Sequence, residues 1–254
     1  GYDNFTGAVD LEKALAWSCK HLVQNQNRLP DGRFSNHFFG DAYGVRAMIE
    51  FVWHARRDPS IVSRNADVLS DCSVDTIEKA AFRWLDMMCD RQLENGMMYM
   101  GYSEPRPSSN VADMGEVCLC VFQMLPYIDD PVRRQRCCEC FGKTLKWAEN
   151  SYIGSAADSL RVAAAYPDEA AKGGAHVGLY GLGELDGRPR SYGVIWVNEL
   201  LMPAHCALLL NGTDEQKDFF KPVFERNSAF IMGEKYHSKT YYHAESVFWH
   251  YLTT

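Results

Sequence analysis

The sequence predicts an all-α fold in which repeated helical hairpins form an (α/α) toroid or part of one. Apolar residues recur at helical spacing along most of the chain, turn signals and irregular stretches separate these segments, and no convincing strand pattern is present. Tryptophan also recurs in the first helix of successive pairs: Trp84 follows Trp17 by 67 residues, and Trp147 follows Trp84 by 63. Such self-similarity indicates stacked units that bury a shared core.

In each predicted hairpin a first helix leads through a loop to a second helix. Pro30-Asp31-Gly32 and Asn95-Gly96 are the turn signals in the first two loops. In the first helix, Trp17 and Cys19 widen an apolar stripe that includes Leu11 and Leu15; in the third predicted helix the stripe is Ile77, Ala80, Ala81, Trp84, Leu85 and Met88. The expected pairs are 8–24 with 41–57, 76–93 with 112–127, 132–151 with 195–210, and 214–232 with 244–252.

The composition is that of one ordinary soluble domain. With 254 residues, 46% hydrophobic and 23% charged, the chain is long enough to bury a core, so residues 1–254 are expected to form a single domain. The net charge of −7 argues against nucleic-acid binding, which needs a basic surface. The cluster Arg133, Arg134 and Arg136 is therefore interpreted as a solvated helix face.

No membrane span is expected, because no run of ~18 apolar residues is present. The oligomeric state and the compartment are left open. Removal of a secretion signal would place the protein in the periplasm or outside the cell, and otherwise it is expected in the cytoplasm.

The nine cysteines are expected to be small buried side chains in their reduced form, since several lie inside predicted helices. The alternative is a zinc site made by Cys137 and Cys140 together with Cys118 and Cys120. Structural zinc sites usually take their closely spaced cysteines from turns and not from helix interiors. The chain has no phosphate loop either. We therefore predict no metal and no cofactor.

The starts of the second helices share a chemical pattern: each carries a carboxylate beside aromatic or histidine residues. If the hairpins stack with alternating direction, these starts meet at one end of the fold. Carbohydrate sites use such surfaces, because aromatic faces pack on sugar rings and carboxylates supply acid and base. The candidate catalytic residues are Asp41, Asp113, Glu116, Glu199 and Glu245. The candidate substrate-binding residues are His37, Tyr43, Arg190, Tyr192, Trp196, Tyr242 and His243.

The roles of these residues depend on the reaction. An inverting hydrolase needs two carboxyl groups roughly 6.5–9.5 Å apart, and Asp41 with Asp113 is the first pair because they begin successive second helices. Glu116 follows Asp113 by one helical turn. A lyase would instead abstract a proton through a histidine or tyrosine, with an arginine neutralising a uronate; the candidates are His37, Tyr192 and His243, with Arg190. Capping and the helix dipole also favour acids at helix starts, without any catalytic role.

The Trp-bearing first helices, the two turn signals and the acids at the second-helix starts resemble the six-hairpin glycosidase-like group of α/α-toroid proteins. The resemblance covers most of residues 8–254 and rests on architecture. That group includes unsaturated glucuronyl and rhamnogalacturonyl hydrolases and related polysaccharide lyases. It implies that Asp41 or Asp113 acts as general acid and base. The sequence departs from the group in having four clear hairpins instead of six.

Two main functions follow from this pattern. The first is a carbohydrate-active enzyme, a glycoside hydrolase or polysaccharide lyase, that acts on an oligosaccharide or another small-molecule ligand in a cleft at the helix ends. The alternative is a non-catalytic helical-repeat module that binds a glycan or a protein partner through the same face. A terpene-cyclase-like toroid is the third, but the chain lacks an Asp-rich metal motif, since Asp129-Asp130 precedes a helix-breaking proline.

Overall fold

The computed structural model describes residues 8–29, 31–35, 38–96, 98, 111–150 and 194–233, except for the side chains of 8–10, 38–39, 111–113, 150, 194–200 and 226–233. All regular secondary structure in these residues is helical, which confirms the all-α class. The helices are α1 (Ala8–Arg28), α2 (Phe38–Arg57), α3 (Ser60–Arg64), α4 (Ala66–Leu69), α5 (Val74–Asp90), α6 (Val111–Met124) with a 3₁₀ turn at Leu125–Tyr127, α7 (Pro131–Asn150), α10 (Val194–Asn211) and α11 (Asp214–Gly233).

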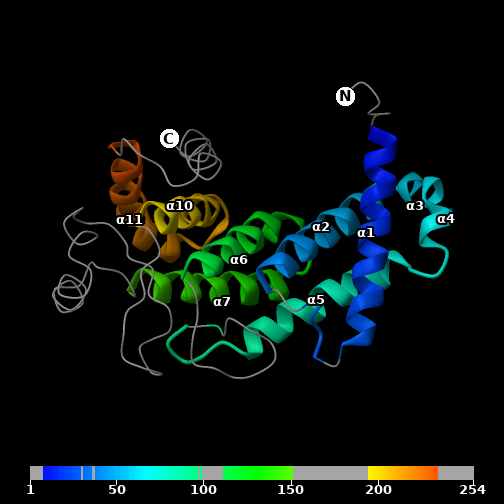
Figure 1. Ribbon diagram of the computed structural model, residues 1–254, viewed down its shortest axis with the longest axis horizontal. Helices are drawn as coiled ribbons and strands as arrows, with labels where there is room; N and C mark the ends of the chain where they lie inside the picture. Colours follow the sequence, from blue (N-terminus) through cyan, green and yellow to red (C-terminus); the bar gives the residue numbers. More distant parts are fainter. Residues whose placement is uncertain are drawn as a thin grey trace.

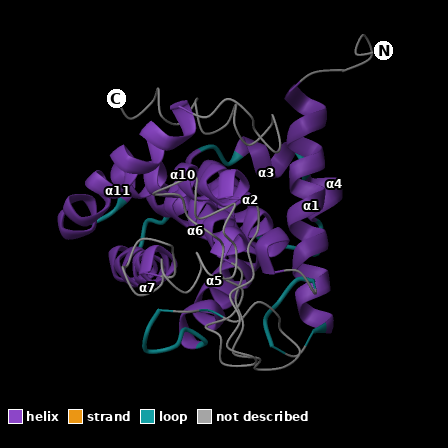
Figure 2. Ribbon diagram, turned by 60° about the vertical axis from the view of Figure 1, so that its left-hand side comes forward, coloured by secondary structure: helices purple, strands orange, loops and turns teal. Residues whose placement is uncertain are grey.

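The long helices form two layers. The inner layer consists of α2, α6 and α10, and α6 packs against both of the others. The outer layer consists of α1 and α5 on α2, α7 on α6, and α11 on α10 (Figures 1 and 2). The inner helices are the predicted second helices, and the outer ones are the predicted first helices. The hairpin alternation is thus present in the described residues, while closure into a ring stays a prediction.

The inner helices run in the same direction. Trp53, near the end of α2, packs edge-on against Tyr127, just after α6, with ring centroids 5.4 Å apart. Asn211, the last residue of α10, donates a hydrogen bond of 3.0 Å from Nδ2 to the carbonyl of Phe122, near the end of α6. Since these helices pack side by side and their last turns meet at one end, their first turns are directed toward the other.

The outer helices α5 and α7 run in the opposite direction to the inner helices that they cover. Arg56, at the end of α2, pairs with Glu78 in the first half of α5 at 2.6 Å. Cys118 of α6 donates from Sγ to the carbonyl of Phe141, past the middle of α7, at 3.6 Å. This antiparallel order is what a stack of αα-hairpins requires.

Local sequence signals explain where the outer helices begin. The Ser73 hydroxyl accepts the backbone N–H of Thr76 and caps α5. Before α7, Asp130 accepts the backbone N–H groups of Val132 and Arg133, and Pro131 occupies the first helical position. These caps satisfy N–H groups that have no partner within their own helix.

α10 contains a stretch that is buried on all sides. Residues 201–208 are all buried, so this part of the helix lacks a solvent face, as its nearly continuous apolar sequence requires. As predicted, the helix continues through Pro203. His205 and Cys206 lie in the core, which was also predicted. None of the helices that the structure describes is both long and apolar enough to cross a membrane.

The core confirms the predicted stripe of α5, whose six members are all buried. The stripe predicted for α1 is confirmed in part: Cys19 is buried and Leu15 packs against the core, whereas Leu11 and Trp17 are 55% and 56% exposed. α1 lies at the edge of the array, and Ala16 and Val23 are also buried in the core. Trp17 stacks on His21 of its own helix, with ring centroids 5.0 Å apart. The two short helices α3 and α4, between α2 and α5, were not predicted.

Candidate functional site

Asp41 lies in the first turn of α2 and is only 2% exposed. One carboxylate oxygen accepts the backbone N–H groups of Phe34 and Ser35 at 3.0 and 3.2 Å, and the other accepts the Ser35 hydroxyl at 2.6 Å. The carboxylate therefore fastens the preceding loop to the start of the inner helix. An acid at a helix start thus has a structural role here, although these partners lie in the loop and not in the helix.

Replacing Asp41 with asparagine is expected to lower the free energy of unfolding by about 1–3 kcal/mol, because the amide NH₂ cannot accept one of these donors and leaves it buried without a partner. Urea unfolding followed by circular dichroism measures the change. Asp75→Asn is the matched control, since Asp75 pairs with Arg56 while 72% exposed and is expected to cost ~0–1 kcal/mol. Equal costs for the two variants would contradict the anchoring role.

The structure describes part of the predicted site. Glu116 lies on α6 at the border of burial, with 9% of its surface exposed, and Tyr43 lies on α2 with 45% exposed. Asp113, Trp196 and Glu199 occupy the early turns of α6 and α10, but their side chains are outside the described residues. The remaining candidates lie outside them altogether: His37, Arg190, Tyr192, Tyr242, His243 and Glu245. The described site thus brings Asp41 and Glu116 onto adjacent inner helices.

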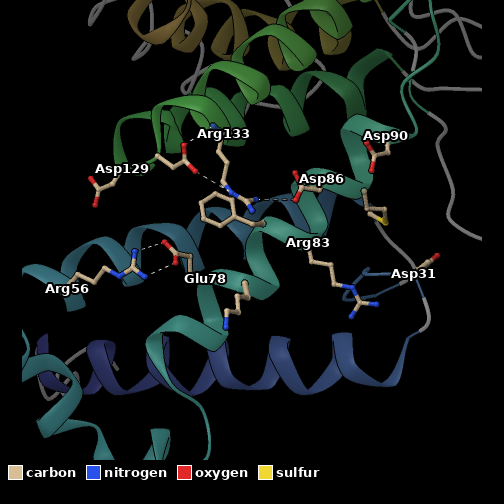
Figure 3. Close-up of a pocket in the computed structure, with 12 residues that line it drawn as sticks. Asp31, Arg56, Glu78, Arg83, Asp86, Asp90, Asp129 and Arg133 are labelled. Atoms are coloured by element: carbon tan, nitrogen blue, oxygen red, sulfur yellow. Dashed lines mark hydrogen bonds and ion pairs between the residues drawn. The ribbon is translucent and has the colours of Figure 1, made fainter.

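Sequence reasoning missed a charged groove of 790 Å³ on the outer layer, which we call the α5–α7 groove (Figure 3). Most of its lining comes from one side of α5, and its other walls come from α7, the end of α2 and two loops. The lining residues are Asp31, Arg56, Glu78, Lys79, Phe82, Arg83, Asp86, Met87, Asp90, Asp129, Asp130 and Arg133. In the sequence these charges have the pattern of solvated helix faces, which gives no signal of a groove.

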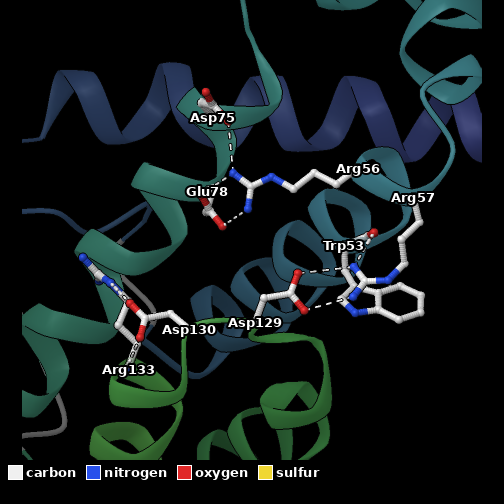
Figure 4. A network of polar contacts seen from close by, with 8 residues as sticks. All are labelled: Trp53, Arg56, Arg57, Asp75, Glu78, Asp129, Asp130 and Arg133. Atoms are coloured by element: carbon white, nitrogen blue, oxygen red, sulfur yellow. Dashed lines mark hydrogen bonds and ion pairs between the residues drawn. The ribbon is translucent and has the colours of Figure 1, made fainter.

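Arg56 lines one end of the groove, and Arg57 pairs with the lining residue Asp129 beside it (Figure 4). Arg56 grips Glu78 with two hydrogen bonds of 2.6 and 2.7 Å, and this pairing raises the pKa of the guanidinium. Arg57 holds Asp129 with bonds of 3.0 and 3.3 Å and lies over the Trp53 ring at 3.8 Å. The hydrogen bonds from Arg57 lower the pKa of Asp129, so this carboxylate stays ionised well into the acidic range.

The middle of the groove is also organised by an arginine. Arg133 donates to Asp86 at 3.2 Å, approaches Asp130 at 3.6 Å, and lies over the Phe82 ring at 4.4 Å. Lys79 lines the groove and forms no ion pair with any described residue. Carboxylates held by arginines are poor proton donors, so the groove suits the binding of a charged ligand better than acid–base catalysis.

The described residues do not support the zinc alternative. No group of three or more His, Cys, Asp or Glu side chains among them could hold a metal ion. Cys118, one of the four proposed ligands, is instead directed at the carbonyl of Phe141.

The chain was compared with known proteins at three levels. No protein-family model matches it, and neither a curated protein nor a solved structure shows significant similarity to it.

Proposed function

We propose that the protein is a carbohydrate-active enzyme, a hydrolase or lyase, that binds an oligosaccharide where the inner helices begin. The observation that carries this proposal is the parallel packing of α2, α6 and α10, whose last turns meet at the opposite end. Three successive helix starts therefore share one end of the fold. Their positive dipole ends and acidic residues suit the recognition of sugar hydroxyls and the transfer of protons.

Asp113 and Glu116 are the acids that we assign to catalysis. They are three residues apart on α6 and so share one helix face. Glu116 is largely buried, with 9% of its surface exposed, which keeps most of the solvent away from its carboxyl group. Asp41 is better suited to positioning, because its two oxygens already accept three hydrogen bonds from the loop at 34–35. Tyr43, exposed on α2, is a candidate sugar-stacking residue.

A panel of oligosaccharides, including unsaturated uronides, tests this function through both binding and product release. Asp113→Asn and Glu116→Gln are each expected to reduce product release by about 100-fold or more while binding persists. Glu139→Gln is the matched control, since Glu139 is exposed on α7 and contacts only Gln135 in the hydrogen bonds described. Cleavage that both α6 variants leave intact would remove the catalytic assignment.

A non-catalytic binding module is the second candidate, and the α5–α7 groove favours it. A groove of 790 Å³ lined by both signs of charge can exchange its internal ion pairs for pairs with a charged ligand. Binding without product release in the same panel, weakened by Lys79→Glu and unaffected by Glu116→Gln, would support this function over the enzyme.

A further inference from the structure

Three thiols meet between the outer helices α5 and α7. Cys89 lies in the last turn of α5, and Cys137 and Cys140 lie three residues apart on one face of α7. Both α7 thiols lie near the sulfur of Cys89 and interact with it electrostatically. Cys137 and Cys140 are buried, whereas Cys89 is partly exposed. Cys89 is therefore the member of the cluster that a reagent can reach from solvent, with two further thiols nearby.

The surroundings of the cluster hold α5 and α7 in register. Arg136 of α7 forms ion pairs of 2.6 Å with Asp86 and with Asp90, which flank Cys89 on α5. One turn further along, Gln92 donates to the carbonyl of Cys140 at 2.6 Å. These contacts fix the distance between the two helices at the point where the sulfurs meet.

The same contacts divide the roles among the thiols. Hydrogen bonds from Cys137 and Cys140, together with the charge of Arg136, lower the pKa of Cys89. The pKa of Cys137 and that of Cys140 are both raised, because each thiol interacts with Cys89 as a donor and is buried. Although burial and Asp86 act against it, Cys89 is the thiol of the three whose surroundings favour the thiolate, and those of the α7 cysteines favour the protonated form.

We propose that Cys89 is a peroxide-reactive thiol that becomes cross-linked to α7 by a disulfide with Cys137 or Cys140. In the first step the Cys89 thiolate attacks one oxygen of hydrogen peroxide, the O–O bond breaks, and Cys89 sulfenic acid and hydroxide form. In the second step an α7 thiol attacks the Cys89 sulfur, the S–O bond breaks, and water leaves. Two thiols lose two electrons in total, and one peroxide is reduced to two waters.

A second pair of interacting cysteines, Cys19 and Cys72, lacks these features. Cys19 and Cys72 are both buried, and burial raises the pKa of Cys19 to about 12. Burial also raises the pKa of Cys72, and the adjacent Asp71 raises it further. This pair has neither a stabilised thiolate nor an exposed sulfur, so it serves as an internal control.

The reactivity of Cys89 is tested on the intact reduced chain with a limiting amount of iodoacetamide, followed by peptide mass mapping. Cys89 is expected to be labelled first, at a rate that changes little between about pH 6 and pH 8, whereas an ordinary thiol gains about tenfold per pH unit over that range. Labelling of Cys89 at the rate and pH dependence of Cys72 would overturn the proposal.

The cross-link is tested by adding one equivalent of hydrogen peroxide. The expected product has lost two hydrogen atoms and yields a peptide that joins Cys89 to Cys137 or Cys140. Cys89→Ser is expected to abolish this product, and Cys72→Ser is expected to leave it unchanged. A Cys89 that stops at sulfinic acid, or a disulfide that forms equally well without Cys89, would contradict the assignment.

A charge variant distinguishes a reactive site from mere proximity of sulfurs. Arg136→Gln is expected to slow the labelling of Cys89 several-fold, since it removes the nearby positive charge. Arg134→Gln, on the exposed side of the same helix, is the matched control and is expected to have no effect. Equal rates in the two variants would show that Arg136 does not activate the thiol and would overturn this part of the mechanism.

Discussion

Replacing Trp84 with alanine is expected to lower the free energy of unfolding by ~3–5 kcal/mol, the range for removing a large buried aromatic side chain. Trp84 is fully buried on α5, where it belongs to the core shared by the two layers. The cavity that the substitution leaves would lie where the packed helices cannot easily close it. Guanidinium unfolding followed by circular dichroism gives the free energy directly, provided that the transition is two-state.

Trp17→Ala is the matched control for this variant, because the two tryptophans hold equivalent places in successive first helices. Trp17 is 56% exposed and stacks only on His21 among the ring contacts described. Its replacement is expected to cost about 1 kcal/mol or less. Comparable losses for the two variants would mean that α1 packs its predicted stripe inward after all.

Replacing Gly96 with alanine has the second largest expected effect, about 2–4 kcal/mol of destabilisation. Gly96 has a φ of +97°, which L-residues rarely adopt. A Cβ at this position would also lie 2.5 Å from the backbone carbonyl oxygen of Lys143 on α7. The carbonyl of Gly96 accepts the Thr144 hydroxyl at 2.9 Å, so a shift of this turn would break a buried hydrogen bond as well.

Gly32→Ala separates the cost of the backbone conformation from the cost of the clash with α7. Gly32 has a similar φ of +89°, but its Cβ would meet only the flexible side chain of Arg83, at 3.2 Å. We expect the cost of the backbone conformation alone, about 1–2 kcal/mol. Thermal unfolding of both variants measures the difference, and a Gly32→Ala variant as unstable as Gly96→Ala would rule out the clash with α7 as the added cause.

Most of the fold is predictable from the sequence because its signals are local. Neighbours within a few residues determine three of these features: the stripe from Ile77 to Met88, the turn at Gly96 and the cap of α7 at Asp130. In the stripe of α1, Leu11 and Trp17 were predicted wrongly, because both are apolar whether or not a neighbouring helix covers them. Burial at an edge of the array depends on which helices flank it, and the local sequence does not encode that.

The candidate site is predictable only as a set of residue types. The acids at helix starts are visible in the sequence, but the anchoring of Asp41 depends on where the backbone of Ser35 turns. The α5–α7 groove depends on pairs such as Arg57 with Asp129, 72 residues apart. The spacing of residue types along the sequence gives no sign of such a pairing. The thiol cluster is similar, since Cys89 belongs to a different hairpin from the two cysteines that it contacts.

The all-round burial of α10 has a consequence for synthesis of the protein on the ribosome. A nascent chain that ends before residue 194 lacks α10, so the apolar surface of α6 that this helix covers is left exposed and prone to association. The early hairpins thus emerge as an incomplete stack that must wait for a helix translated much later. During that interval the exposed flank is a natural substrate for a chaperone.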